Sequence, residues 1–133
     1  MTTKIDHIAI VVEDIEKALA VYRDVIGLPV ETLAEEPEEA VRMAFLPTTS
    51  GKIELIQPLT SDSGVAKFLA KRGEGLHHIC LEVEDIDATI EEMSTRGLEV
   101  LGEPRFNESG EKYVFIHPKS AHGVLLELYE RQG

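Results

Sequence analysis

The sequence predicts an α+β fold in which two tandem βαβββ units form a curved mixed-sheet cup. The strongest observation is an internal repeat, because residues 5–15 (IDHIAIVVEDI) return as residues 76–86 (LHHICLEVEDI). The ends of the two copies also match, since KIEL at residues 52–55 returns as LLEL at residues 125–128. In both copies an alternating apolar segment precedes apolar residues at helical spacing, which is typical of a strand leading into a helix.

The length of 133 residues suits one domain with its own core. We therefore expect a single domain over residues 1–133, made of two βαβββ repeats at about 4–60 and about 75–130. A helical segment at about 61–73 is expected to join the two repeats.

The first repeat begins with an apolar, β-branched strand at residues 5–12. Asp14 is a suitable N-cap for the helix that follows, and Gly27 is suited to end that helix at its C′ position. The acidic residues around Pro37 are expected to form a solvated loop. Three further strands are expected at residues 28–33, 41–46 and 52–57.

The second repeat has the same order of elements. Its first strand is expected at residues 76–83, and Asp85 is the N-cap of a helix that ends at Gly97. Pro118 follows its strand in the second copy as Pro47 does in the first. The remaining strands are expected at residues 98–101, 113–117 and 124–129.

Composition narrows the possible functions and compartments. The net charge of −12 argues against non-specific nucleic-acid binding, which needs a basic surface. No apolar run approaches the roughly 20 residues of a membrane helix, and the N-terminus lacks the apolar segment of a signal peptide. The single cysteine excludes an intrachain disulfide and fits a reducing compartment, so we expect a cytoplasmic protein.

Strand alternation places four polar residues on one face of the predicted sheet. On the first strand of each repeat, the residues that pack on the helix alternate with His7 in one copy and His78 in the other. On the last strand of each repeat, Glu54 and Glu127 alternate with apolar neighbours in the same way. Because the helix covers the opposite face of a βαβββ unit, these four side chains should line the concave face.

Two histidines and two carboxylates are a ligand set for a divalent metal ion. A single histidine or glutamate on a strand usually has a hydrogen-bond partner or faces solvent. Here, however, the same residue types recur at equivalent positions and on the same face of the strands. The sequence therefore predicts a metal site made of His7, Glu54, His78 and Glu127. Co²⁺, Mn²⁺, Ni²⁺ and Zn²⁺ all remain open as its ion. Cys80, on the same face, is expected to line the pocket.

The loop before the last strand contains four polar residues, His117, Lys119, Ser120 and His122. Two interpretations are open for this segment. It is either a solvated loop, or a lip that binds the carboxylate or phosphate of a ligand.

Longer motifs extend over nearly the whole chain. IDHIA at residues 5–9 and GVLLEL at residues 123–128 resemble the vicinal oxygen chelate superfamily, which includes glyoxalase I, extradiol dioxygenases and bleomycin resistance proteins. Three motifs are more specific to the methylmalonyl-CoA epimerase family within it: VAKFL at residues 65–69, GLHHIC at residues 75–80 and HPKS at residues 117–120.

This resemblance implies a metal-dependent epimerisation of methylmalonyl-CoA at C2, by proton abstraction through a metal-stabilised enediolate. By the same similarity His7, His78 and Glu127 match metal ligands of the family, and Glu54 matches a position that varies between Gln and Glu. A homodimer and an acyl-CoA substrate are implied as well.

The resemblance also suggests which residues act on the substrate. Glu54 and Glu127 are the candidate proton-transfer groups, and Lys119 and Ser120 are the candidate substrate-binding residues. Some epimerases carry an additional Glu on the third strand, where this chain has Val-Arg-Met-Ala at residues 41–44 and no carboxylate. The identity of a second base therefore stays open.

Two other functions remain as alternatives. One is a different metal enzyme of the superfamily, such as a glyoxalase I type lyase, which also uses two His and two Glu ligands. A dioxygenase would instead use two His and one carboxylate, so Glu54 argues against it. The other is a non-catalytic small-molecule-binding or resistance protein, against which the complete set of four ligands argues.

Overall fold

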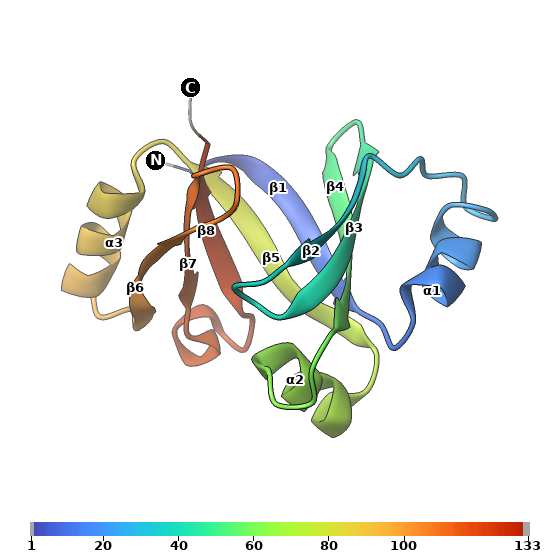
Figure 1. Ribbon diagram of the computed structural model, residues 1–133. Coiled ribbons are helices and arrows are strands. Elements are labelled where there is room, and N and C mark those ends of the chain that lie inside the picture. The colour runs from blue at the N-terminus through green and yellow to red at the C-terminus, as the bar shows by residue number, and fades with distance from the viewer. Residues whose placement is uncertain (1, 132–133) are drawn as a thin grey trace. The chain divides into compact units, whose positions relative to one another are not determined.

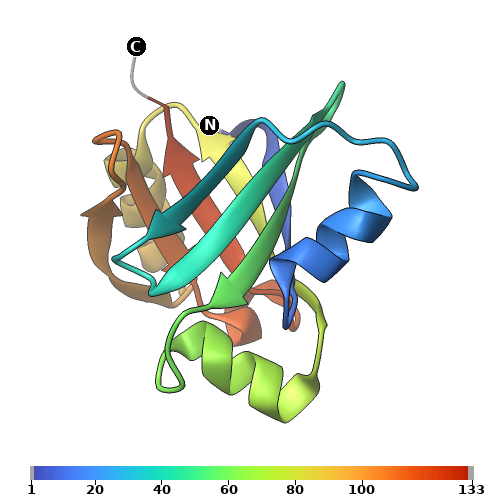
Figure 2. The same cartoon turned by 45° about the vertical axis from the view of Figure 1, so that its right-hand side comes forward.

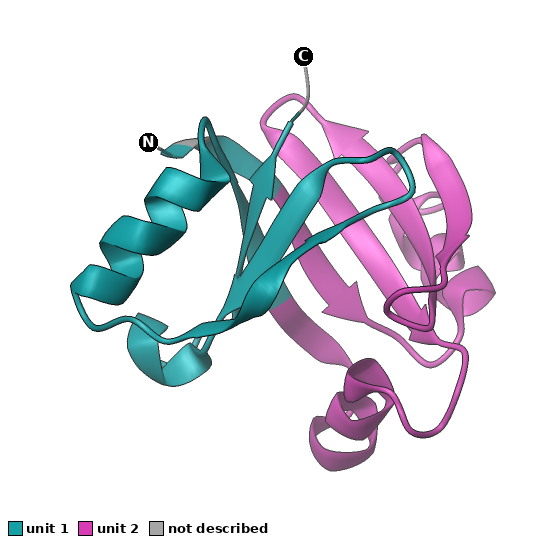
Figure 3. Cartoon of the chain, turned by 60° about the vertical axis from the view of Figure 1, so that its left-hand side comes forward, with its two compact units in different colours: residues 1–6, 78–133 teal, residues 7–77 magenta. Residues whose placement is uncertain are grey.

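The computed structural model describes residues 2–131, and the chain divides into two compact units (Figure 3). Unit 2 consists of residues 7–77, and unit 1 combines residues 1–6 with residues 78–133. Strand β1 (Thr2–Val11) has residues in both units, because the chain passes from unit 1 to unit 2 between Asp6 and His7. Strand β5 (Gly75–Val83) also has residues in both, because the chain returns to unit 1 at His78.

Unit 2 is a mixed sheet with helices (Figure 1). Its strand order is β2-β3-β4-β1, in which β1 runs parallel to β4 and the other neighbours are antiparallel. The elements that follow β1 are α1 (Ile15–Tyr22), β2 (Thr32–Glu36), β3 (Val41–Thr48), β4 (Gly51–Pro58) and α2 (Gly64–Arg72).

Unit 1 has the same arrangement. Its strand order is β5-β8-β7-β6, with β5 parallel to β8 and the other neighbours antiparallel. Its elements are β5 (Gly75–Val83), α3 (Ile86–Thr95), β6 (Val100–Phe106), β7 (Lys112–Ile116), the 3₁₀ helix η1 (Pro118–Ala121) and β8 (Leu126–Glu130). The predicted α+β fold of two tandem βαβββ units is confirmed.

Equivalent caps start the first helix of each repeat. The Asp14 side chain accepts hydrogen bonds from the backbone N–H groups of Glu16 and Lys17, and Asp85 accepts one from Ala88. Each helix then buries apolar residues against its own sheet, as Leu19 does beside Leu55. Burying one leucine side chain contributes about 1.5–3 kcal/mol. Within residues 2–131, the helices are too short or too polar to cross a bilayer.

Helix α2 covers part of the sheet face opposite α1, for which the sequence predicted no covering helix. Both α1 and α2 lie against β4 (Figure 2), but they use alternate residues of that strand. Leu55 packs with α1, whereas Ile56 packs with Val65 of α2 together with Ala9 and Val11 of β1. The face that carries His7 and Glu54 therefore has its own apolar core further along the strands.

The predicted strand at residues 28–33 is wrong, because β2 begins only at Thr32 and extends to Glu36. Leu28 and Val30 pack against the α1 core, so their alternation reflects burial and not strand pairing. The ladder with β3 starts where Thr32 pairs with Phe45, and two of the acidic residues expected in a loop are therefore in a strand.

Strand β6 is longer than the predicted segment at residues 98–101, since it continues to Phe106. Its pairing with β7 shifts register between Leu101 and Arg105. This irregularity accommodates Pro104, which has no N–H to donate, at the edge of the sheet.

Candidate metal centre

In unit 2 the structure brings His7 and Glu54 together. Strand β1 runs parallel to β4 in a register that pairs Ala9 with Glu54, so the two polar side chains lie on the same face of neighbouring strands. His7 Nε2 lies 3.1 Å from Glu54 Oε1, and both residues are buried. The pair is held by backbone ladders and not by a flexible loop.

Unit 1 repeats this arrangement with His78 and Glu127. Strand β5 runs parallel to β8, and Cys80 pairs with Glu127 as Ala9 pairs with Glu54. His78 Nε2 lies 2.9 Å from Glu127 Oε1, and the Glu127 side chain is 13% exposed. Cys80 is fully buried beside the pair. Each unit thus contains one His–Glu pair, built in the same register.

A phenylalanine completes each pair, which we did not predict from the sequence. Phe45 on β3 pairs with Glu54, and its ring lies edge-on to His7 at 5.3 Å between centroids. Phe115 on β7 pairs with Glu127 and lies edge-on to His78 at 5.4 Å. The signal in the sequence was that both strands contain a Phe between apolar residues, in Ala-Phe-Leu at residues 44–46 and Val-Phe-Ile at residues 114–116. Edge-on contact fixes the orientation of an imidazole.

The donor atoms suit a divalent ion. Imidazole nitrogen and carboxylate oxygen bind Zn²⁺ at about 2.0–2.2 Å, so two such ligands at the tetrahedral angle lie about 3.4 Å apart. The His–Glu separations of 3.1 and 2.9 Å are hydrogen-bond distances, within about 0.5 Å of that spacing. Among the described residues, no buried side-chain N or O atom lacks a hydrogen-bond partner, so both pairs are satisfied as they stand.

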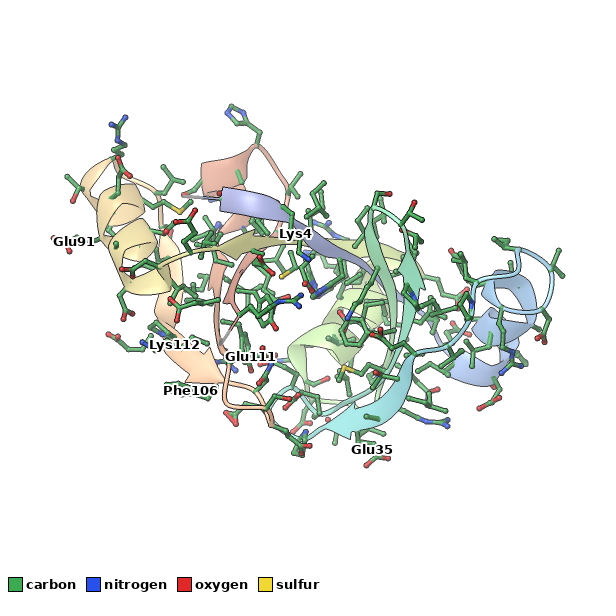
Figure 4. The ribbon with its side chains drawn as sticks, turned by 90° about the horizontal axis from the view of Figure 1, so that it is seen from above. Lys4, Glu35, Glu91, Phe106, Glu111 and Lys112 are labelled. Atoms are coloured by element: carbon green, nitrogen blue, oxygen red, sulfur yellow. The ribbon has the colours of Figure 1, made fainter. Side chains whose placement is uncertain are left out.

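The same face of unit 1 continues beyond the His78–Glu127 pair into a row of polar side chains. Tyr129 pairs with Tyr113 across β8 and β7. Burial, followed by a hydrogen bond to Glu111, raises the pKa of Tyr129 far above its ordinary value, so its hydroxyl stays protonated. Glu111, at the β6–β7 hairpin (Figure 4), also accepts a hydrogen bond from Asn107 Nδ2 at 3.4 Å.

The loop that includes η1 is tied to the start of β6. Ser120 Oγ accepts a hydrogen bond from the backbone N–H of Glu99 at 2.8 Å, and His117 Nδ1 accepts one from the N–H of Lys119 at 3.0 Å. The Lys119 side chain is exposed. Ser120 therefore has a structural role in the loop, and its hydroxyl can still donate a proton of its own.

Strand β3 supplies no carboxylate to the face that carries the His–Glu pair of unit 2. Met43 is half-buried and pairs with Ile56, next to Phe45 and Glu54 in the same ladder. The side chain on this face is thus an apolar thioether where some epimerases are expected to have a glutamate.

Comparison with known proteins agrees with this architecture. The family model of the Glyoxalase/Bleomycin resistance protein/Dioxygenase superfamily matches residues 6–115. An ethylmalonyl-CoA/methylmalonyl-CoA epimerase from Cereibacter sphaeroides is 41% identical over 131 residues, which cover 96% of this chain and 98% of that protein. The mitochondrial methylmalonyl-CoA epimerase of Homo sapiens is 38% identical over 127 residues, which cover 94% of this chain and 72% of that protein.

A solved structure gives the same result. It is a variant of Streptomyces coelicolor methylmalonyl-CoA epimerase in complex with 2-nitronate-propionyl-CoA, with a TM-score of 0.92 and 37% sequence identity. The alignment covers 100% of this chain and 97% of that one. The chain therefore belongs to the glyoxalase/bleomycin resistance protein/dioxygenase superfamily and, within it, to the methylmalonyl-CoA epimerase family.

Proposed function

We infer that the chain is an isomerase that epimerises methylmalonyl-CoA at C2, interconverting its R and S forms. One observation carries this inference: a chain 41% identical to an epimerase of such substrates has a His–Glu pair at the same register in each of its units. The substrate is accordingly an acyl-CoA thioester.

The proposed ligands of one divalent ion are His7, Glu54, His78 and Glu127. Two facts support this set. Each pair has donor types that suit such an ion. A single pair also offers fewer ligands than the three or four that a protein site normally supplies.

The ion's identity is part of the proposal, with Co²⁺, Mn²⁺, Ni²⁺ and Zn²⁺ as candidates. When bound, a divalent ion polarises the thioester carbonyl and the carboxylate on either side of C2, which makes the C2 proton more acidic. The residues of the chain then orient the substrate and move the proton.

Glu54 and Glu127 are proposed to transfer the proton. Inversion requires that one proton leaves one face of C2 and another reaches the opposite face. One carboxylate accepts the C2 proton, while the other donates a proton to the opposite face; the glutamate that holds a proton is not bound to the ion at that moment, because a ligand carboxylate is deprotonated. The number of protons on the two glutamates is unchanged by a turnover, and the reverse reaction exchanges their roles. Met43 provides no alternative base on β3.

Lys119 and Ser120 are proposed to contact the substrate, as a cation and a hydroxyl donor in the loop that includes η1. We also propose that the protein is a homodimer in the cytoplasm. Size-exclusion chromatography with light scattering tests the dimer, and a monomeric mass would exclude it.

The proposed reaction is tested by proton exchange in D₂O. Purified protein loaded with Co²⁺ is incubated with one enantiomer of methylmalonyl-CoA, and deuterium at C2 and optical rotation are followed together. We expect deuterium incorporation with loss of chirality, abolished by a chelator and in His7→Ala and Glu127→Gln. Glu91→Gln, an exposed change on α3, is the matched control and should retain full activity.

The absence of exchange in a folded, metal-loaded protein would exclude the epimerase function. In that case the hemithioacetal of methylglyoxal and a thiol is the next substrate, which tests the glyoxalase I type alternative. Absence of bound metal together with absence of exchange would favour a non-catalytic binding protein.

A further inference from the structure

The positive charges of the chain are mostly neutralised by carboxylates, except on α2. The cations in ion pairs are Lys4, Arg23, Arg42, Lys52, Arg96, Lys112 and Arg131. Over residues 2–131, five lysine or arginine side chains have no carboxylate within ion-pair distance: Lys17, Lys67, Lys71, Arg72 and Lys119. Three of these five lie on one helix, although the chain has 25 acidic residues and only 13 basic ones.

The last turn of α2 also carries an aromatic platform. The guanidinium carbon of Arg72 lies 5.4 Å from the centroid of the Phe68 ring. Phe68 in turn meets His77 edge-on, with 4.9 Å between the ring centroids. A guanidinium beside an aromatic ring is held there by a cation–π contact, and its N–H donors can bind a phosphate with two hydrogen bonds.

Helix α2 lies on the same face of unit 2 as the His–Glu pair. Its Val65 packs against Ala9 and Val11, which share a face of β1 with His7. Val11 is four residues beyond His7, or about 13 Å along an extended strand. A ligand that reaches His7 with one end can thus extend along this face toward α2 with the other.

We propose that Lys67, Lys71 and Arg72 form a binding site for the phosphates of the adenosine 3′,5′-diphosphate part of CoA. This assignment rests on the proposed function, because it concerns the remote end of the same substrate. A CoA thioester carries a pyrophosphate and a 3′-phosphate, and a protein of net charge −12 repels such an anion unless cations stand free where it binds. Unpaired lysines act as point charges, and Arg72 adds a directed contact.

Binding of adenosine 3′,5′-diphosphate, measured by titration calorimetry, tests the site directly. The triple variant Lys67→Ala, Lys71→Ala, Arg72→Ala should bind at least about tenfold more weakly than the unmodified chain, and each single variant about 2- to 5-fold more weakly. Wild-type binding should weaken with added salt. All three side chains are exposed, so the substitutions should leave the fold intact, which circular dichroism of the variant checks.

Lys17→Ala is the matched control, because Lys17 is an exposed and unpaired cation of α1 in the same unit. It should leave binding of the nucleotide unchanged. Equal affinity of the triple variant and the unmodified chain would overturn the proposal, and so would an equal loss in Lys17→Ala, since that would indicate only a general effect of charge.

Kinetics separate this proposal from the proposed function. For methylmalonyl-CoA the triple variant should show a raised KM at unchanged kcat. For the methylmalonyl thioester of N-acetylcysteamine, which lacks the nucleotide, kcat/KM should not change. If kcat/KM for the short thioester falls as much as kcat/KM for the CoA thioester, the proposed phosphate-binding site is refuted. A protein that epimerises neither thioester but loses nucleotide binding in the triple variant would refute the proposed function and support the phosphate site.

Discussion

The ring of Phe115 lies edge-on to the imidazole of His78, with centroids 5.4 Å apart and an angle of 86° between the planes. Phe45 and His7 repeat this contact at 5.3 Å and 74° in the other unit. In both cases the phenylalanine is also the ladder partner of the glutamate that meets the histidine. The imidazole thus contacts both an aromatic ring and a carboxylate, which orients its donor nitrogen in advance of any ligand.

Phe115→Leu should weaken Co²⁺ binding about 2- to 10-fold, because an aromatic pair of this geometry is worth about 0.5–1.5 kcal/mol. Titration calorimetry measures the affinity. Phe106→Leu, an exposed change on β6 (Figure 4), is the control and should bind normally. Unchanged affinity in Phe115→Leu would mean that the ring serves packing only.

Glu127→Gln should reduce metal affinity by at least about a hundredfold, since it removes a charged donor next to the His78 nitrogen. Metal content after dialysis, measured by mass spectrometry, gives the outcome. Glu91→Gln should retain its metal. If Glu127→Gln also retains a stoichiometric amount of metal, Glu127 is not a ligand.

Removal of the metal should lower the melting temperature. A ligand at a hundred times its Kd stabilises the folded state by about 2.7 kcal/mol. In a chain of this length that corresponds to a shift of about 10 °C. Differential scanning fluorimetry with and without a chelator measures the shift. The His7→Ala, His78→Ala double variant should melt at the same temperature in both conditions, and a shift that persists there would assign the ion to other residues.

Stability should fall at alkaline pH because of Tyr129. Burial and the Glu111 hydrogen bond raise the pKa of Tyr129 above its ordinary value of 10.0 in the folded state. The folded chain therefore keeps this proton where the unfolded chain has lost it. The stabilising contribution is complete below about pH 10 and decreases as the pH rises above that value.

Urea unfolding at about pH 8 and about pH 11 measures this effect. Tyr129→Phe should reduce the difference between the two free energies of unfolding, whereas Tyr22→Phe should leave it unchanged. An equal difference in the Tyr129→Phe variant would assign the alkaline loss to other groups.

Ser120→Ala should lower the free energy of unfolding by about 0.5–1.5 kcal/mol, because the N–H of Glu99 loses its acceptor. Lys119→Ala should leave stability unchanged, since this side chain is exposed and forms no ion pair in the described part of the chain. Chemical denaturation compares the two variants. If Lys119→Ala raises KM without loss of stability, the loop contacts the substrate; an unchanged KM would mean that it does not.

The sequence predicted the α+β class and the tandem βαβββ units, and both are confirmed. It could do so because the repeat, the caps Asp14 and Asp85 and the strand alternation are local properties of the chain. Parity also sufficed to place His7 and Glu54 on one face, since a side chain's face depends only on its position along the strand. Whether all four ligands hold one ion remains a prediction.

Other features depended on which segments pair and pack, and only the tertiary structure decided them. Strand β2 begins at Thr32 because pairing with β3 starts opposite Phe45, and Leu28 and Val30 face α1 instead. The two phenylalanines reach the histidines through the register of a neighbouring strand, which alternation within one strand does not specify.

The unpaired cations of α2 are a property of the same kind. Composition showed an excess of acids, which would allow every lysine and arginine a partner. Whether a carboxylate comes within reach of a given cation depends on the fold, since ion pairs form over a few ångströms and between segments far apart in the chain. The sequence by itself therefore determined the order of the elements and the faces of their side chains, and the tertiary structure decided which of those side chains meet.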